Sequence, residues 1–267
     1  MSLTSNQKNK FYDNAAEALH YASMTVPAMH KTTAAVIPVV LEVPLFAVMR
    51  KRKADEVLPT VNATWFKKGR GFVKYAGPQL LQSHLTVLLT LINLRAGQVV
   101  DNVFEFRPSE LLARMGWSDN ARNISRLTDL LDDLKHGQVR LWSDGQDEKR
   151  DSLRVSFVDA FQPATAGSWT VTLSKQLMPL FDGNKTFVSL AKRSMLDEGL
   201  DTFLHGYLAA NSCALPFAYK DIHAACGSRS KDLKDFTDSV QRALDKLVKV
   251  GAIADYKKER GAFRVLK

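Results

Sequence analysis

The spacing of apolar residues between Gln82 and Phe106 predicts a helix followed by a strand. From Gln82 to Leu94, leucine and isoleucine recur at the spacing of one helix face, and Gly97 lies where a glycine commonly caps a helix C-terminus. The next segment, "NVFEFR", alternates apolar and polar residues, which is typical of a short, half-buried strand. We therefore expect a helix and then a strand ahead of Pro108.

Two further helices and a hairpin are predicted by the stretch that follows. Pro108 opens "SELLARM", because proline is tolerated at the first helical position, and Gly116 ends it. Ser118 or Asp119 can cap the next helix, which runs to about Lys135. Its apolar stripe comprises Ile124, Leu127, Leu131 and Leu134. The strands "QVRLW" and "SLRVSFVDAF", joined by the polar turn "SDGQDEKR", complete the element order of a winged helix: helix, strand, helix, turn, helix, hairpin.

The same order recurs in the second half of the chain. "WTVTL" and "FVSL" predict strands, "SMLDEGLDTFLHGYLAAN" a long helix, "LPFAY" a short extended piece, and "KDIHAAC" a second helix that Gly227 stops. "SKDLKDFTDSVQRALDKLVKVG" predicts the third helix, with an apolar stripe of Leu233, Phe236, Val240, Leu244 and Leu247. "AIADY", the turn "KKERG" and "AFRVLK" then form a wing. Recurrence of the whole order favours a repeated unit over a chance helix-turn-helix.

We therefore predict an α+β fold of two tandem winged-helix domains related by internal duplication, residues 57–161 and 168–267, with an N-terminal arm. Residues 1–43 are expected to form that arm outside the main core, and residues 44–56 a basic linker. The apolar run "AAVIPVVLEVPLFAVM" contains Glu42 and two prolines, which argues against a membrane span, and its position in the chain argues against a signal peptide. We expect no membrane partner.

Charge favours a polyanionic partner. The chain has 37 Lys and Arg against 28 Asp and Glu, a net charge of +9. Residues 50–75 hold eight Lys and Arg against two acids, a local +6, and residues 212–267 hold twelve against seven, a local +5. Such basic stretches attract nucleic acid through long-range forces and counterion release. Only two cysteines, Cys213 and Cys226, are present, so a reduced cytoplasmic chain is expected, with neither a disulfide framework nor a zinc site.

The candidate DNA contacts lie at the front of each third helix and on the second wing. In a helix-turn-helix the recognition helix enters the major groove, and its first turns face the base edges. Because the apolar stripe faces the core, the readers must lie off that stripe. The candidates are Ser118, Asn120, Arg122, Asn123 and Arg126 in the first domain, and Ser228, Arg229, Ser230, Lys231, Lys234, Lys257, Lys258 and Arg260 in the second.

These residue types divide into two roles. Arg and Asn can pair bidentately with guanine and adenine edges, whereas Lys and Ser more often contact phosphates. We therefore expect Arg122 and Arg229 to read bases and Lys258 to contact the backbone. Asp132 and Asp133, late in the first recognition helix, indicate that only its front meets DNA. The alternative is that these polar residues merely form the solvated face of a core helix.

Nothing in the sequence predicts an enzyme. The six histidines are scattered, and neither a metalloprotease motif nor the paired histidines of a nickase is present. "GNKT" lacks the glycine spacing of a phosphate-binding loop, and "QLMPLF", which loosely resembles a sliding-clamp docking peptide, is expected to be a short helix packed in the second domain. We expect no catalytic residues, no metal and no cofactor.

Three stretches carry a family resemblance. They are "LF" followed by a basic run, "ELLARMGWSDNARNISRLTDLLDDL", and "LDTFLHGYLAANSCALPFAYKDIHAACGSRSKDLKDFTDSVQRALDKL". Over about residues 44–267, and in the same order, they resemble the TrfA family of plasmid replication initiators. The Gly-Trp-Ser-x-Asn-x-Arg and Cys-Gly-Ser elements are the most specific. The family elements fall on Trp117, Ser118, Asn120 and Arg122 in the first domain and on Gly227, Ser228, Arg229 and Ser230 in the second.

The resemblance implies a bacterial protein that binds direct repeats, called iterons, in a plasmid origin and helps melt an adjacent AT-rich segment. It also implies recruitment of the host replicative helicase and sliding clamp, and an inactive homodimer formed through the first winged helix. The chain departs from the family by lacking an upstream Gln-Leu-Ser-Leu-Phe-type clamp peptide, which argues against clamp recruitment by that route. Two other readings stay open: a transcriptional repressor, which would bind an inverted repeat as a dimer, and a protein-interaction module.

Overall fold

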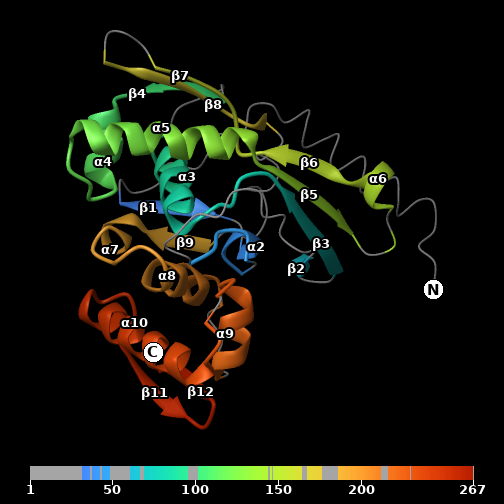
Figure 1. The fold of residues 1–267 in the computed structure, drawn as a ribbon, viewed down its shortest axis with the longest axis vertical. Coiled ribbons are helices and arrows are strands. Elements are labelled where there is room, and N and C mark those ends of the chain that lie inside the picture. The colour runs from blue at the N-terminus through green and yellow to red at the C-terminus, as the bar shows by residue number, and fades with distance from the viewer. Residues whose placement is uncertain are drawn as a thin grey trace.

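The computed structural model describes residues 32–36, 38–42, 44–48, 61–66, 69–95, 102–143, 145, 147–163, 167–175, 186–211, 216–228 and 230–266. Figure 1 shows two bodies along the long axis, with α7 (Leu190–Arg193) and α8 (Leu200–Ala210) lying between the green elements at the top and the red elements at the bottom. No helix among these residues is long and apolar enough to cross a membrane. The predicted α+β fold is confirmed.

The upper body contains the first winged helix. Its elements are α3 (Gln82–Arg95), β4 (Val103–Phe106), α4 (Pro108–Arg114), α5 (Ala121–His136), β7 (Val158–Pro163) and β8 (Trp169–Leu173). The strands form a three-stranded sheet in the order β4-β8-β7, so that the strand between the first two helices pairs with the second strand of the wing. Gly116, at a φ of 74°, ends α4 as predicted.

The lower body repeats this arrangement. Its elements are α8, β10 (Phe217–Ala218), α9 (Tyr219–Ala225), α10 (Leu233–Lys249), β11 (Asp255–Glu259) and β12 (Ala262–Leu266). Their strand order, β10-β12-β11, is the counterpart of β4-β8-β7. Gly227, at a φ of 62°, follows α9. The predicted internal duplication is therefore confirmed at the level of topology.

The first wing differs from the predicted one. β5 (Gln138–Ser143) and β6 (Leu153–Ser156) do pair, but they extend the hairpin of β2 (Val61–Phe66) and β3 (Gly69–Ala76) into a four-stranded sheet, β2-β3-β5-β6. The predicted single strand "SLRVSFVDAF" breaks at the buried Phe157 into β6 and β7, which belong to different sheets. β8, predicted to open the second half, instead pairs with β4 and β7.

The apolar run near the N-terminus belongs to the core. β1 (Thr33–Val36) pairs with β9 (Thr186–Ser189), and the short helix α2 (Pro38–Glu42) follows. Ala34, Val36 and Leu41 are at most 3% exposed, and so is Phe46 beyond them. Residues 32–36, 38–42 and 45–47 are thus packed against the rest of the protein and do not form part of a free arm or linker, because their apolar side chains complete the upper core. The basic run at residues 50–53 lies outside the described residues.

Two apolar cores correspond to the two bodies. The upper core extends from Ala34 to Leu190 and includes the predicted stripe residues Leu127, Leu131 and Leu134. The lower core extends from Leu196 to Phe263 and includes Phe236, Val240, Leu244 and Leu247. The predicted stripe residue Leu233 is instead 48% exposed, because it is the first residue of α10 and lies ahead of the core.

Two helices begin later than predicted. The cap of α5 is Asn120, whose side-chain oxygen accepts a hydrogen bond from the Asn123 backbone N–H at 2.9 Å, so neither Ser118 nor Asp119 is the cap. The predicted long helix from Ser194 to Asn211 is α8 alone, preceded by a turn. Gly199 has a φ of 110°, which is not helical, so the helix begins after it. A Cβ there would lie 3.0 Å from the Val48 carbonyl oxygen, which favours glycine at this position.

Candidate nucleic-acid interface

The front of α5 presents most of the predicted first-domain readers to solvent. Ser118, Asn120 and Arg122 are exposed, and Asn123 is half-buried. Asn120 and Asn123 also shape the backbone, since Asn123 Nδ2 donates to the Ser118 carbonyl oxygen at 2.7 Å while Asn120 caps the helix. Arg122 is different: its guanidinium has no hydrogen-bond or ion-pair partner among the described residues. It is therefore the available bidentate donor of this helix start.

Arg126 is held by neighbouring side chains. Its guanidinium carbon lies 4.0 Å from the centre of the Trp117 ring, a cation–π contact, and its Nη2 forms an ion pair with Glu198. Glu198 belongs to the turn between α7 and α8, in the lower half of the molecule. The predicted reader Arg126 is thus exposed in part, at 43% of its side chain, but engaged within the chain.

The start of α10 is more mixed in charge than predicted. Lys231 and Lys234 are exposed, but Asp232 caps the helix by accepting from the Lys234 N–H at 2.7 Å, and the exposed Asp235 and Asp238 follow. Arg229 lies outside the described residues. The two described lysines therefore stand beside carboxylates, an arrangement better suited to phosphate contact than to a purely cationic groove.

The loop before α10 is ordered by its serines. Ser228 Oγ accepts from the Ser230 N–H at 3.2 Å, and Ser230 Oγ donates to the Asp232 carbonyl oxygen at 3.0 Å. The Ser230 carbonyl oxygen also lies 3.0 Å from His223 Nε2 on α9. These hydrogen bonds hold the predicted serines in the turn itself, so their hydroxyls serve the local backbone.

The second wing presents the cations predicted for it. Lys257, Lys258 and Arg260 are all exposed, and Arg260 with Gly261, at a φ of 72°, makes the tight turn. The predicted turn "KKERG" included Lys257 and Lys258. In the structure both lysines lie in β11. Glu259, the acid beside the turn, forms an ion pair with Arg264 at 2.8 Å and is neutralised within the wing. The tip of the wing is accordingly cationic.

A row of cations on the four-stranded sheet was missed in the sequence. The strand register places Lys74 opposite Arg140, and Arg140 opposite Arg154, so the three side chains lie on one face of adjacent strands. Glu148 accepts from Lys74 at 2.9 Å and lies 3.7 Å from Arg140, leaving Arg154 exposed. The sequence shows the alternation within each strand. It does not show that the three cations are neighbours, because that depends on pairing between strands far apart in the sequence.

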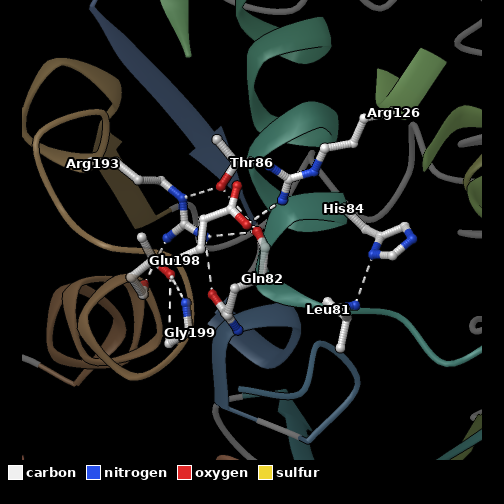
Figure 2. A network of polar contacts seen from close by, with 9 residues as sticks. Leu81, Gln82, His84, Thr86, Arg126, Arg193, Glu198 and Gly199 are labelled. Carbon is white, nitrogen blue, oxygen red and sulfur yellow. Dashed lines mark hydrogen bonds and ion pairs between the residues drawn. The ribbon is translucent and has the colours of Figure 1, made fainter. Parts of the chain in front are cut away.

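The joint between the two bodies is a buried polar network, also missed in the sequence (Figure 2). Arg193 of α7 is 2% exposed and donates from Nε to Thr86 Oγ1 at 2.8 Å. Its Nη1 donates to the Thr202 carbonyl oxygen at 2.7 Å, and its Nη2 to both the Gln82 carbonyl oxygen, at 3.2 Å, and the Gln82 side-chain oxygen, at 2.9 Å. Burial lowers the pKa of Arg193 to about 9, while the nearby Glu198 acts in the opposite direction. One guanidinium thus joins α3 to α7 and α8.

A second buried polar pair supports α5 from behind. Asp133, 7% exposed, places its Oδ2 at 2.9 Å from Nε2 of the buried His84 of α3, and His84 Nδ1 accepts from the Leu81 N–H. Asp133 therefore belongs to the packing between α3 and α5, and not to the solvent face of the recognition helix. This contact spans 49 positions of the sequence, which explains why periodicity alone could not find it.

Metal ligands and cavities complete the description of this surface. No group of three or more His, Cys, Asp or Glu side chains able to hold a metal ion occurs in the part of the chain that the structure describes. A polar cavity of about 390 Å³ beside Arg154 has a lining that mixes Lys175 with Asp159, so it does not define an anion site. What the fold and these surfaces define is a tandem winged-helix protein that presents exposed cations at both recognition-helix starts and on the second wing.

Solved structures share this fold. The chain is similar to the crystal structure of RctB domains 2-3, with 13% sequence identity, a TM-score of 0.59, and coverage of 85% of this chain and 95% of that one. A selenomethionine derivative of domains 2 and 3 of RctB gives 12% identity and a TM-score of 0.57 at the same coverage. No protein-family model and no curated protein sequence matches the chain. The likeness therefore establishes the fold, and the specific resemblance to the TrfA family stays a prediction.

Proposed function

We propose that this protein is a replication initiator that binds the direct repeats of a plasmid origin through both winged helices, without enzymatic activity of its own. The observation that carries the proposal is the duplication of one winged-helix topology, with exposed cations at the start of each recognition helix and on the second wing. The fold likeness to RctB, a replication initiator, and the sequence resemblance to the TrfA family both support it.

Two recognition helices in one chain favour an initiator over a simple repressor. A monomer can place α5 and α10 in successive major-groove segments, which suits tandem direct repeats, whereas a repressor with one recognition helix per subunit needs a dimer and an inverted repeat. Origin opening, loading of the host helicase, contact with the sliding clamp and a homodimer through the first winged helix belong to the proposal through the family resemblance. A cytoplasmic location follows from the same role.

The first test is the salt dependence of DNA binding. If about six phosphates are neutralised, the slope of log K against log salt should be near −5, so that binding weakens about a thousandfold between 50 and 200 mM salt. Fluorescence anisotropy with a labelled duplex from the DNA adjoining the coding region measures this slope. A random duplex of equal length serves as the reference for specificity. A slope near zero would rule out DNA binding and leave the protein-interaction module.

The second test separates base contacts from phosphate contacts. Arg122→Ala should weaken binding to the specific duplex by roughly 1 to 3 kcal/mol and leave random DNA nearly unaffected, because a bidentate base contact discriminates by about that amount. Lys258→Ala should weaken both duplexes alike, since a phosphate contact carries no sequence information. Equal losses on random DNA for both variants would contradict this division of roles.

A further inference from the structure

The turn between α7 and α8 packs against the front of the first recognition helix. Gly116, in the turn that precedes α5, lies so close to Ser194 that an added Cβ would meet the Ser194 carbonyl oxygen at 3.0 Å. Further along the two segments, Arg126 of α5 and Glu198 of the turn form their ion pair. The lower body therefore contacts the upper one beside the surface that we propose for reading DNA.

Arg126 is constrained from two directions at this contact. Trp117 covers one face of its guanidinium at 4.0 Å. Glu198 takes the Nη2 donor (Figure 2). The side chains remain 43% and 33% exposed, respectively, so the pair faces solvent and can be broken without unfolding either body. An exposed ion pair of this kind is weak, and a phosphate oxygen can compete for the same donor.

Glu198 also has a second cationic neighbour. Its Oε1 atom is buried and has no hydrogen-bond partner among the described residues, whereas the buried Arg193 lies near enough to interact electrostatically. Figure 2 shows Glu198 between the Arg126 and Arg193 side chains. If Arg126 moved to a phosphate, the carboxylate would therefore keep one attractive partner, which lowers the cost of the exchange.

We infer that Glu198 is a positioning residue that holds Arg126 away from DNA until a phosphate displaces it. The inference rests on the proposed function, because it needs a duplex at the front of α5. Glu198 belongs to the second winged-helix half and Arg126 to the first, so the contact links the front of α5 to the second half. Loss of the carboxylate frees Arg126 and adds one phosphate contact.

The experiment compares Glu198→Gln with the wild type in the anisotropy titration described above. We expect Glu198→Gln to bind the duplex roughly two- to fivefold more tightly, the change associated with removing an exposed ion pair, and to steepen the salt slope by about one. Arg126→Gln should bind more weakly than the wild type. In the Glu198→Gln, Arg126→Gln double variant, the glutamate substitution should add nothing to the effect of Arg126→Gln alone.

A matched control excludes a general charge effect. Asp197 neighbours Glu198, is 73% exposed in its side chain, and pairs with Lys246 at 2.6 Å instead of with Arg126. Asp197→Asn removes one negative charge, as Glu198→Gln does, but should leave the salt slope unchanged. Equal tightening by both variants, tightening that persists without Arg126, or weaker binding by Glu198→Gln would each overturn the inference.

A second variant covers the case in which Glu198→Gln unfolds. Glu198→Asp keeps the charge but shortens the reach to Arg126, and we expect its affinity to exceed that of the wild type as well. Thermal unfolding of each variant checks that the fold is intact. If neither the wild type nor any variant binds the duplex, the proposed function itself fails; if all bind alike, only the role of Glu198 fails.

Discussion

Replacing Arg193 with alanine should destabilise the folded chain by about 3 to 5 kcal/mol. The substitution removes a buried side chain, and it leaves the Gln82 oxygens, Thr86 Oγ1 and the Thr202 carbonyl without the donor that they share. The Gln82 side-chain oxygen loses this donor at a cost of about 1 to 3 kcal/mol, and the vacated volume adds a cavity cost of similar size, whereas the Gln82 carbonyl oxygen keeps the Thr86 hydroxyl as a donor. Urea unfolding followed by circular dichroism measures the free energy of unfolding directly.

The matched control for this prediction is Arg242→Ala. Arg242 is exposed on α10, and its hydrogen bonds to described residues stay within its own helix, at the Asp238 carbonyl and Ser239 Oγ. Its loss should change the free energy of unfolding by less than about 0.5 kcal/mol. A loss below about 1 kcal/mol for Arg193→Ala would show that the joint does not depend on this guanidinium. We also expect the variant to separate the unfolding of the two bodies into distinguishable transitions, because their shared polar contact is gone.

The stability of the protein should fall on acidification through His205. Burial lowers the pKa of this imidazole to about 3, with the charges of Arg193 and Lys192 acting in the same direction. The unfolded chain binds a proton at His205 near pH 6.5 and the folded chain does not, so stability is full above pH 6.5 and declines as the pH falls toward 3. Between pH 7.5 and 5 this group alone should remove about 2 kcal/mol, and about 4 to 5 kcal/mol over the full range.

His205→Leu isolates that contribution. Leucine fills a similar buried volume in α8 and cannot be protonated, so the difference in unfolding free energy between pH 7.5 and 5 should shrink by about 2 kcal/mol relative to the wild type. Measurements above pH 5 keep most carboxylates ionised and outside the comparison. An unchanged pH dependence in the variant would show that His205 takes up its proton in the folded state.

Local signals in the sequence located α3, α4, α5, α9 and α10. The apolar spacing of Leu127, Leu131 and Leu134 identified the buried face of α5, and Gly116 and Gly227 identified where α4 and α9 stop. Both signals act within a few residues, through helix periodicity and through the backbone freedom of glycine. The repeated element order then predicted the fold class, because the same order of helices and strands in both halves of the chain is unlikely to arise by chance.

Sheet membership could not be obtained in this way. β5 and β8 both show the expected alternation, but alternation does not say which strand is the neighbour, and here β5 joins β3 while β8 joins β4. The choice depends on packing across distant segments, as with β1 and β9, which are separated by most of the upper body. The two strands predicted for the first wing do pair, but the sheet to which they belong was not predicted for this reason.

Polar contacts at a distance were equally hidden in the sequence. Arg193 looked like one more cation of a basic chain, although it is buried, and Arg126 was chosen for its position without any indication that Glu198 would hold it. Neither residue type nor spacing encodes a partner 72 or 107 positions away. Arg122 was also chosen for its position, and it is exposed at the helix start with no partner among the residues that the structure describes.

The buried joint around Arg193 also bears on the DNA that such a protein could accept. If the two recognition helices are fixed to one another, the distance and rotation between them are set before any DNA binds. Once one recognition helix has bound its half-site, binding of the other is intramolecular and has a high effective concentration. This holds only for half-sites whose spacing matches that of the two helices. A duplex turns once in about 10 base pairs, so a few extra base pairs between half-sites would rotate the second site out of reach. Under the proposed function, the buried Arg193 contact fixes the spacing of the half-sites that the protein accepts, although Arg193 lies away from the proposed DNA-binding surface.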